Sequence, residues 1–463
     1  MRRYDAGCGI RRSMRTPIAD FVSAYQATDV SRFHMPGHKG KPLLGTEPWD
    51  ITEIDGADVL YSANGIIEES EDITSSLFHT AHSFFSAEGS TLTIKAMLML
   101  ATQNVKEQPL ILAARNAHKA FIYGAALLDI DVEWLYPEPL AHLCRCEISA
   151  EMLQKQLQKM DKKPCAVYIT SPDYLGQTAD IRALSEVCKE FSLPLLVDNA
   201  HGAYLEFLSP SQHPIALGAD MCCDSAHKTL PVLTGGAYLH ISKNAPLCYL
   251  ENARNALSLF ASTSPSYLIL QSLDLCNRYL SDGYPEKLKQ CIQTIENIKA
   301  KMAEKGFAPE ESEPLKIVLH TAKYGYTGDE LSLHLKKFQI VPEFYDREYL
   351  VLMITPENRE KDFERLLLAW DEISPKTALP ASHHQLEKGK AVLPLRKAML
   401  GAQEIIPIEK ALGRICASPT VSCPPAVPVV ISGEEITAGA IEIFRLYGVE
   451  SVAVTKIKNE IYF

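Results

Sequence analysis

The stretch Ser225-Ala226-His227-Lys228 places a hydroxyl, an imidazole and an amine within four consecutive residues. A lysine that is held among other polar groups and away from bulk water has a lowered pKa, and its amine can form a Schiff base with an aldehyde. On its own, the stretch reads better as an exposed lysine in a polar turn. The rest of the chain must therefore decide between these two interpretations.

A second stretch that could do chemistry is Gly89-Ser90-Thr91, which leads into the apolar run Ile94–Leu100. A helix that begins with such residues presents free N–H groups and hydroxyls at the positive end of its dipole, which suits a phosphate group. An ordinary helix cap is the commoner explanation. The chain has no Gly-x-x-x-x-Gly-Lys-Ser/Thr motif, so a nucleotide triphosphatase loop is not supported.

Short apolar strands that alternate with helical segments would position these groups. We predict strands at 110–114, 166–170 and 193–197, with a helix at 183–191 before the last of them. This alternation indicates an α/β fold with a mostly parallel sheet, and ligands bind such sheets beyond the carboxyl ends of the strands. Polar residues gather at that edge, namely His118, Tyr174, Asp198, His201 and Lys228. Each alone could be an ordinary loop residue, but their shared placement favours an active site.

A phosphate site, a Schiff-base lysine and a strand-end aspartate together fit one cofactor, pyridoxal phosphate. Lys228 would bind its aldehyde, and Asp198 would keep its pyridine nitrogen protonated, which makes the ring an electron sink. His118 offers a flat imidazole to stack on the ring. If the reaction is a decarboxylation, the α-carbon needs a proton after CO2 has left, and His227 and Lys228 are the natural donors. The phosphate would be held by Gly89, Ser90, Thr91 and Ser225.

The composition is that of an ordinary soluble globular protein. The chain has 463 residues, enough for two or three domains, and 46% of them are hydrophobic. A formal net charge of −11 argues against a nucleic-acid surface. No apolar run approaches the ~20 residues of a membrane span, so no membrane contact is expected. Twelve cysteines include no Cys-x-x-Cys pair, so we expect no metal site and no disulfide framework, and free thiols fit a reducing cytoplasm.

Changes of pattern along the chain predict five segments. Residues 1–60 form an N-terminal tail and arm, and residues 61–300 form the large cofactor-binding domain. Residues 301–372 form a smaller α/β domain. A polar, proline-containing linker at 373–394 leads to an α+β C-terminal domain at 395–463.

Several motifs occur in this chain in the order in which one known family has them. They are Phe33-His34-Met35-Pro36-Gly37-His38, Arg115-Asn116-Ala117-His118-Lys119, Asp198-Asn199-Ala200-His201-Gly202, Ser225-Ala226-His227-Lys228-Thr229-Leu230 and, near the end, Pro424-Pro425 and Gly433-Glu434. On these motifs the chain resembles the bacterial ornithine/lysine/arginine decarboxylase family, whose fold is of the aspartate-aminotransferase type, fold type I. The resemblance covers nearly the whole chain from about Met14.

The resemblance implies the roles given above for Lys228, Asp198 and His118, and it adds His201 to the cofactor site. It also implies that Ser264, in the stretch Ser262-Thr263-Ser264, reaches the cofactor phosphate of a neighbouring subunit, because this fold builds its sites at a dimer interface. The large domain begins near residue 61, which leaves no room for the N-terminal wing domain of the long family members. We therefore expect a short-form cytoplasmic enzyme that is a homodimer or a dimer of dimers.

The expected reaction is the pyridoxal-phosphate-dependent decarboxylation of a basic amino acid to an amine and CO2, as part of polyamine biosynthesis. Arginine is the first choice of substrate, followed by lysine or ornithine. A cationic side chain needs acidic partners, and we predict Asp55, Asp58 and Glu434 for this role. Two alternatives are another fold-type I enzyme, such as an aminotransferase or a lyase, and a non-catalytic family member. An aminotransferase commonly uses an arginine to clamp the substrate carboxylate, for which Arg347 in the small domain is one position to test.

Several residues depart from the family's pattern, and three of them stand next to residues of the predicted site. Glu88 stands where Asn or Gln is usual, Asn199 replaces a Glu, and Asp173 replaces a Thr or a similar residue. None of them removes a group that the cofactor needs. The departures therefore bear on the choice of substrate more than on the class of reaction.

Overall fold

The computed structural model describes residues 14–137, 145–380, 387–421 and 427–456. The predicted tail at 1–13 and the pair Pro424-Pro425 of the C-terminal motif lie outside these residues.

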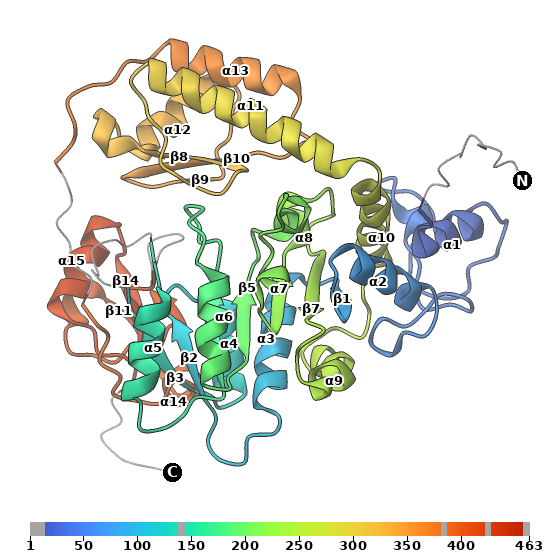
Figure 1. The fold of residues 1–463 in the computed structure, drawn as a ribbon, viewed down its shortest axis with the longest axis horizontal. Helices are drawn as coiled ribbons and strands as arrows, with labels where there is room; N and C mark the ends of the chain where they lie inside the picture. Colours follow the sequence, from blue (N-terminus) through green and yellow to red (C-terminus); the bar gives the residue numbers. More distant parts are fainter. Residues whose placement is uncertain (1–13, 138–144, 381–386, 422–426, 457–463) are drawn as a thin grey trace, which may run out of the picture.

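A seven-stranded sheet forms the centre of the large domain, with the strand order β1-β7-β6-β5-β4-β2-β3 (Figure 1). Strand β7 runs antiparallel to both of its neighbours, and the other neighbouring pairs are parallel. The prediction of an α/β fold with a mostly parallel sheet is therefore confirmed. The strands are β1 (His82–Ser86), β2 (Leu110–Ala114), β3 (Asp131–Leu135), β4 (Ala166–Thr170), β5 (Leu195–Asp198), β6 (Met221–Asp224) and β7 (Ala237–Ile241).

The strands predicted at 110–114 and 166–170 have these bounds in the structure. Both are almost wholly apolar, as expected of parallel strands that are covered on both faces. The strand predicted at 193–197 begins two residues later, at Leu195. Pro194 has no N–H to donate to a neighbouring strand, so the regular pairing starts after it.

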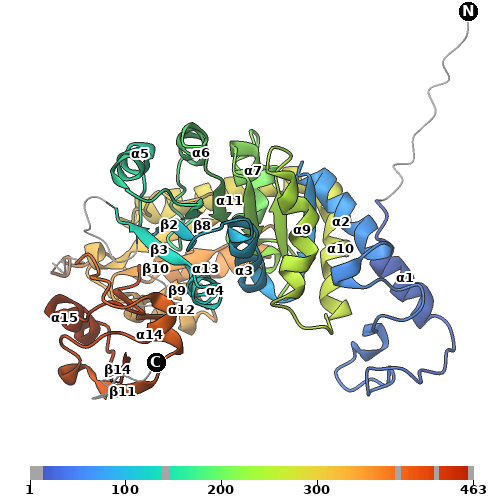
Figure 2. The same ribbon diagram turned by 90° about the horizontal axis from the view of Figure 1, so that it is seen from below.

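Helices cover both faces of the sheet, and alternate side chains of β2 point into different cores. Ile111 and Ala113 pack with α3, α4 and α9, whereas Leu112 and Ala114 pack with α5 and α6. Figure 2 shows α5 and α6 on one side of β2 and β3, and α3 and α4 on the other. These helices are α3 (Gly89–Thr102), α4 (Lys119–Leu127), α5 (Ala150–Lys159), α6 (Ile181–Glu190), α7 (Pro214–Leu217) and α9 (Leu247–Ser258).

Three helices pack together beside the sheet, α1 (Pro17–Gln26), α2 (Ile66–Leu77) and α10 (Tyr267–Ser281). Helix α1 ends at Gln26. The N–H and the hydroxyl of Thr28 both donate to the carbonyl of Tyr25, which closes the chain into a turn after the last helical residue. Short 3-10 helices in the large domain are η1 (Glu47–Trp49), η2 (Leu60–Ser62) and η3 (Ala203–Phe207).

The small domain is an antiparallel sheet of order β8-β10-β9, which helices cover (Figure 1). Its elements are β8 (Lys316–His320), η4 (Thr321–Tyr324), α12 (Gly328–Lys337), β9 (Phe344–Tyr345), β10 (Tyr349–Met353) and α13 (Glu360–Asp371). Helix α11 (Tyr284–Glu304) packs on α10 and η3 of the large domain and also on β8 and α13 of the small domain. One continuous helix therefore connects the two domains.

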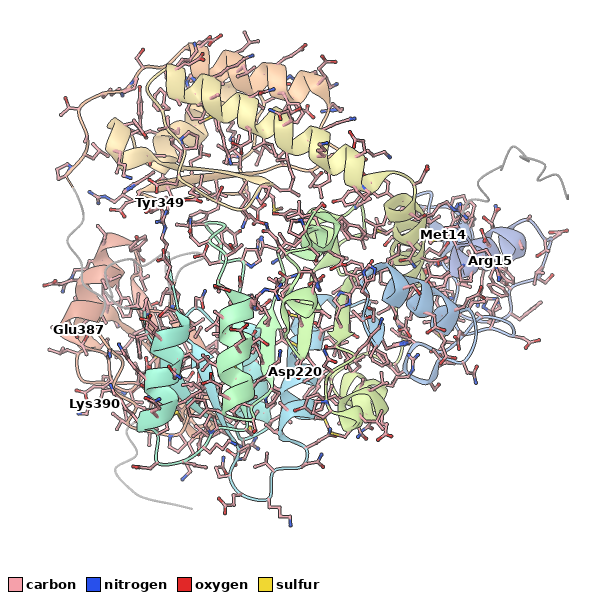
Figure 3. All side chains as sticks on the ribbon, in the orientation of Figure 1. Met14, Arg15, Asp220, Tyr349, Glu387 and Lys390 are labelled. Atoms are coloured by element: carbon pink, nitrogen blue, oxygen red, sulfur yellow. The ribbon has the colours of Figure 1, made fainter. Side chains whose placement is uncertain are left out.

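A small apolar cluster joins the small domain to the loop after β4. Tyr349 and Phe344 of the small domain pack with Leu175 of that loop. Tyr349 is placed on the side of the small domain that faces the sheet (Figure 3). The small domain is thus held against the carboxyl ends of the strands, where the sequence predicts the ligand site.

The C-terminal domain has its own core and pairs β11 with β14 and β12 with β13. Its elements are α14 (Leu395–Leu400), β11 (Gln403–Pro407), η5 (Ile408–Lys410), β12 (Thr420–Val421), β13 (Val430–Ile431), α15 (Ala438–Leu446) and β14 (Ser451–Thr455). Helix α14 packs on α4, and Arg396 donates to the carbonyls of Ala126 and Leu127. In the part of the chain that the structure describes, every helix is too short or too polar to cross a membrane.

Candidate active site

A cavity of about 300 Å³ lies beyond the carboxyl ends of β2, β4, β5 and β6. The loops that follow these strands contribute His118, Asp198 and Lys228 to its wall, as the strand order predicts. Residues from the C-terminal domain complete the wall. The lining residues are Ser90, Asn116, Ala117, His118, Lys119, Thr170, Pro172, Asp173, Tyr174, Asp198, Ala200, His201, Lys228, Thr420, Val427 and Pro428.

Lys228 lies on the short helix α8 (Ala226–Thr229), directly after β6. Its Nζ is 3.2 Å from Nε2 of His201. Burial lowers the pKa of Lys228, although the nearby Asp198 acts in the opposite direction. Burial also lowers the pKa of His201 well below its usual range, with further repulsion from Lys316 and Lys228. A neutral His201 can accept a hydrogen bond from the amine of Lys228, which holds this amine in the cavity.

Asp198 is the last residue of β5 and is only 2% exposed. The hydroxyl of Tyr168 donates to its Oδ2 over 3.2 Å, and the backbone N–H of Ala200 donates to its Oδ1 over 3.2 Å. Burial raises the pKa of Tyr168 well above its usual range, so its hydroxyl keeps the proton that it donates. Asp198 is therefore a well-oriented buried carboxylate that can accept a further hydrogen bond from a ligand.

The predicted phosphate groups meet at the start of α3. Ser225 donates from its Oγ to the Oγ of Ser90 over 2.8 Å, and Ser90 lines the cavity. Gly89 has a φ of +70° and donates its N–H to the carbonyl of Gly235 over 2.7 Å, so it contributes a turn and not an amide. Thr91 follows as an exposed residue of the same helical turn.

Glu88 does not crowd this site with a negative charge. Its Oε1 accepts the backbone N–H of Ser262 over 2.7 Å, which directs the carboxylate toward the loop 262–264. Ser264 of this loop is exposed. The carboxylate of Glu88 therefore binds the neighbouring loop and does not repel a phosphate group.

The two predicted histidines differ in their positions. His118 caps α4, where its Nδ1 accepts the N–H of Ala120 over 3.2 Å, and desolvation lowers its pKa. Its ring is therefore neutral and lines the cavity. His227 donates from Nδ1 to the carbonyl of Gly236 over 2.9 Å, and it is not among the lining residues.

Five lining side chains carry a buried polar atom without a hydrogen-bond partner. These atoms are Asn116 Oδ1, Thr170 Oγ1, Asp173 Oδ2, His201 Nδ1 and Thr420 Oγ1. An unpaired buried polar group costs about 1–3 kcal/mol, so five of them in one cavity indicate a site built for a polar ligand. The residues present fit pyridoxal phosphate. Asp198 would hold the ring nitrogen, Lys228 the carbonyl carbon, and Ser90 with Ser225 the phosphate.

None of the acids that we predicted for substrate binding lines the cavity in this chain. Asp55 is exposed. Both carboxylate oxygens of Asp58 accept backbone N–H groups near the start of α2, including those of Gly65 and Ile67. Burial acts to raise the pKa of Asp58, but these amides outweigh it and lower the pKa. Arg347, the position considered for a carboxylate clamp, is exposed and does not line the cavity.

Glu434 is engaged by Arg115, which follows β2. The guanidinium donates to both carboxylate oxygens over 2.6 and 2.8 Å, and both side chains are almost fully buried. Arg115 also donates to the carbonyl of Pro428 and lies over the rings of Trp134 and Tyr136. This pair joins the C-terminal domain to the large domain next to the cavity wall.

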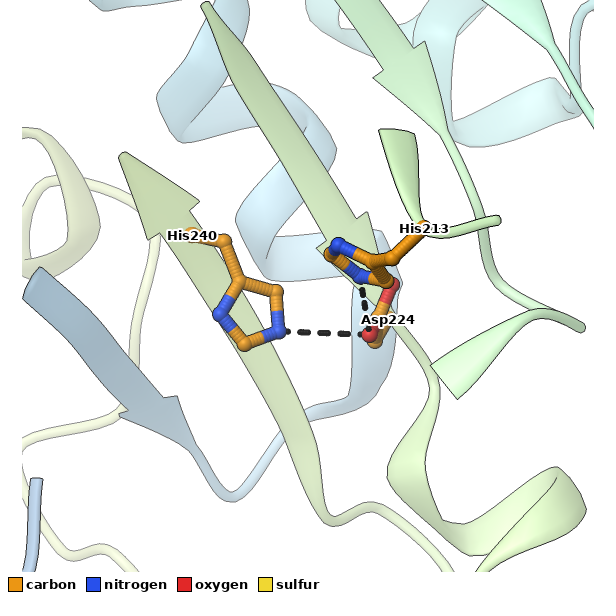
Figure 4. Close-up of side chains that lie close together, drawn as sticks. All are labelled: His213, Asp224 and His240. Carbon is orange, nitrogen blue, oxygen red and sulfur yellow. Dashed lines mark hydrogen bonds and ion pairs between the residues drawn. The ribbon is translucent and has the colours of Figure 1, made fainter. Parts of the chain in front are cut away.

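Sequence reasoning missed a buried cluster around Asp224, the last residue of β6 (Figure 4). Nε2 of His213 and Nε2 of His240 lie 3.1 and 3.2 Å from the same oxygen, Oδ2 of Asp224, and all three side chains are fully buried. Asn199 donates to the other oxygen over 2.7 Å. Nδ1 of His213 accepts a backbone N–H, so its Nε2 carries the proton and donates to Asp224. The cluster thus works as a hydrogen-bond network, and the spacing of its residues in the sequence gives no signal of it.

Asn199 and Asp224 join the two strand ends that carry the predicted cofactor residues. Asn199 follows Asp198 directly, and Asp224 precedes Ser225. The histidines lower the pKa of Asp224 far below its usual range, although burial alone would raise it. The network therefore holds a buried anion, and through it the ends of β5 and β6 keep a constant spacing.

Comparisons with known proteins show the family of this chain. The family description "Orn/Lys/Arg decarboxylase, major domain" matches residues 16–320, and "Orn/Lys/Arg decarboxylase, C-terminal domain" matches residues 385–454. The protein YaaO of Bacillus subtilis is 29% identical, and the match covers 93% of each chain. The arginine decarboxylase of the same organism is 28% identical, with 91% of each chain covered.

Solved structures show the same fold. The lysine decarboxylase LdcF of Francisella novicida superposes with a TM-score of 0.79 at 17% identity, covering 95% of this chain and 79% of that one. The major-domain match alone spans more than half of the chain. The chain therefore belongs to the Orn/Lys/Arg decarboxylase family and is a pyridoxal-phosphate-dependent amino-acid decarboxylase that acts on a basic amino acid.

Proposed function

We propose that the substrate is arginine, with lysine and ornithine as the next choices, and that the amine product enters polyamine biosynthesis. The observation that carries the decarboxylation itself is the placement of Lys228, Asp198 and the Ser90–Ser225 pair around one cavity. Full-length relatives that are named arginine decarboxylase support arginine over the other two.

Each residue has a defined task in this proposal. Lys228 binds the cofactor carbonyl, Asp198 holds the pyridine nitrogen and His118 lies against the ring. Ser90, Thr91 and Ser225 hold the phosphate, with Gly89 supplying the turn. When bound, pyridoxal phosphate supplies an electron sink for the pair of electrons that CO2 leaves behind.

The proton for the α-carbon comes from Nζ of Lys228 in this proposal. His201 lies 3.2 Å from this nitrogen and orients it. The other predicted donor, His227, flanks the lysine, but its Nδ1 proton is engaged by Gly236. Replacing His227 with Gln, which keeps a donor to that carbonyl, is therefore expected to slow the reaction less than Lys228→Ala.

We also propose that the enzyme is a homodimer or a dimer of dimers in the cytoplasm. Large apolar side chains in the N-terminal arm are exposed, with Phe33 at 95%, Leu43 at 84% and Leu44 at 89%. Ser264 is exposed as well, which suits a contact with a neighbouring subunit's phosphate. Nine described cysteines are free thiols, as in a reducing compartment. Light scattering of the purified protein tests the oligomeric state, and a monomer would contradict it.

The reaction is tested by measuring CO2 and amine from arginine, lysine and ornithine in parallel. Arginine is expected to give CO2 and the matching amine at the highest kcat/KM. Lys228→Ala is expected to abolish the reaction and the absorbance band of the lysine-bound cofactor. An oxo acid in place of CO2 would indicate an aminotransferase. A protein that stays colourless with added cofactor would indicate a non-catalytic member.

A further inference from the structure

The cavity offers few groups that could receive the charged end of a basic amino acid. Among its lining residues the carboxylates are Asp173 and Asp198. Asp198 is placed for the cofactor ring. Asp55, Asp58 and Glu434 are absent from the lining, and the last two are held by other partners. Among the lining residues that the structure describes, Asp173 is therefore the carboxylate that remains for a cationic side chain.

Asp173 has one free acceptor in a nearly closed environment. The residue is 6% exposed, and its Oδ1 accepts the N–H of Gln177 over 2.8 Å, while its Oδ2 has no partner. Burial raises its pKa to about 6. A buried carboxylate with an unused oxygen is costly, and a cation placed beside it removes this cost.

The nearest basic residues are already occupied. Lys316 forms an ion pair with Glu313 over 2.8 Å and donates to the backbone carbonyls of Asp173 and Tyr174. Arg145 forms an ion pair with Glu310 over 3.0 Å. Lys119, which also lines the cavity, is exposed. Asp173 thus keeps an attraction for a further cation.

Two more acceptors line the same cavity. Oδ1 of Asn116 and Oγ1 of Thr420 are buried without partners, and Thr420 comes from the C-terminal domain. A guanidinium group has five N–H donors and an ammonium group has three, so either can bond to several acceptors at once. A neutral side chain would leave Asp173 buried and unpaired.

We propose that Asp173, with Asn116 and Thr420, binds the distal cationic group of the substrate and so selects basic amino acids. This inference rests on the proposed function for the reaction that follows binding. It assigns a specificity role to Asp173, one of the residues in which the chain departs from the family's usual pattern.

The test compares a cation with its uncharged isostere on the holoenzyme. Butylguanidinium and butylurea have the same shape but differ in charge, and neither can react with the cofactor. By calorimetry, the wild-type holoenzyme is expected to bind butylguanidinium and to reject butylurea. In Asp173→Asn the affinity for butylguanidinium is expected to fall at least about 30-fold, which is the effect of removing one partner of a buried charge pair. Asp173→Asn is expected to lower kcat/KM for the best basic substrate by the same factor, chiefly by raising KM. The kcat/KM for citrulline, which is uncharged, is expected to stay the same.

Asp180→Asn is the matched control. Asp180 is exposed, lies seven residues away outside the cavity, and likewise accepts one backbone N–H, that of Ala183. Asn at 173 can still accept the N–H of Gln177, so the turn is kept. Thr420→Val, which removes one acceptor at nearly constant volume, is a second variant and is expected to weaken butylguanidinium binding several-fold.

The outcomes separate the two proposals. If the wild type makes no CO2 from any basic amino acid but distinguishes the two ligands through Asp173, the reaction proposal fails and the cation site stands. If Asp173→Asn still distinguishes them, or if the wild type never does, the cation site is wrong. Glu343 accepts a hydrogen bond from Tyr174 over 2.8 Å. If only Glu343→Gln lost the preference for butylguanidinium over butylurea, Glu343 would be the residue that binds the cation, and the role of Asp173 would be refuted.

Discussion

Replacing Glu434 with Gln leaves Arg115 buried without a counter-charge. The guanidinium is fully buried and bonds to both oxygens of Glu434, so no water can replace the lost partner. Removing one partner of a buried ion pair costs about 3–5 kcal/mol. Gln keeps an acceptor for the N–H of Ile431, which donates to Glu434 over 2.8 Å, so the loss falls on the charge and the bonds to Arg115.

Hydrogen exchange measures this cost within the C-terminal domain itself. Global unfolding does not, because a chain of several domains does not unfold in two states. Each 1.4 kcal/mol is a factor of ten, so amides in the β11–β14 pair are expected to exchange roughly 100- to 3000-fold faster in Glu434→Gln. Amides of β2 and β4 serve as an internal reference. The double variant with Arg115→Met is expected to recover most of the loss.

A control lies within the same domain. Glu404 pairs with Arg414 over 2.6 Å, but its side chain is 41% exposed, so Glu404→Gln is expected to cost no more than about 1 kcal/mol. If Glu434→Gln exchanged no faster than Glu404→Gln, or if the two buried changes were simply additive, the buried pair would not be what holds the C-terminal domain in place.

Three further predictions follow from individual residues. The pKa of Asp173 is raised to about 6, so its ionised form destabilises the free protein as pH rises through 6. The variant Asp173→Asn is therefore expected to be more stable than the wild type by about 3 kcal/mol at pH 8 but by little at pH 4. Equal gains in stability at both pH values, measured by thermal unfolding, would refute this. Gly176→Ala is expected to cost about 1–2 kcal/mol, because φ is +82° and an added Cβ would lie 3.0 Å from Ser312, whereas Gly37→Ala meets no atom within 4 Å and should melt like the wild type. Asp224→Asn removes a charged acceptor shared by two histidines and is expected to cost about 1.5–3 kcal/mol in the apoenzyme and to weaken cofactor binding; an unchanged melting temperature and cofactor affinity would contradict the role of the network.

The sequence predicted the groups around the cofactor because they follow strands in a repeated pattern. His118, Asp198 and Lys228 each come shortly after an apolar run, and the topology of a parallel sheet brings such positions to one edge. This prediction required no knowledge of which side chains contact one another. The bounds of β2 and β4 followed from the same local signal.

The acidic residues could not be assigned in this way. Asp58 and Glu434 lie in loops that resemble an acidic entrance, and a carboxylate that bonds to backbone amides looks the same in sequence as one that awaits a substrate. The partner of Glu434 lies 319 residues away, at Arg115. Asp173 was visible only as a departure from a pattern, because its unpaired oxygen and its place in the cavity depend on how the large and C-terminal domains pack.

Helix α11 sets a limit on how the small domain can move. It has 21 residues and is about 31 Å long, and a helix resists stretching because each turn is hydrogen-bonded to the next. Its first turn follows Gly283, whose φ of +73° suits a sharp change of direction. Because α11 packs on both domains, it acts as a rigid lever. A swing of the small domain about the start of α11 would carry Glu343 away from Tyr174, to which it is hydrogen-bonded, while the length of the helix stays constant.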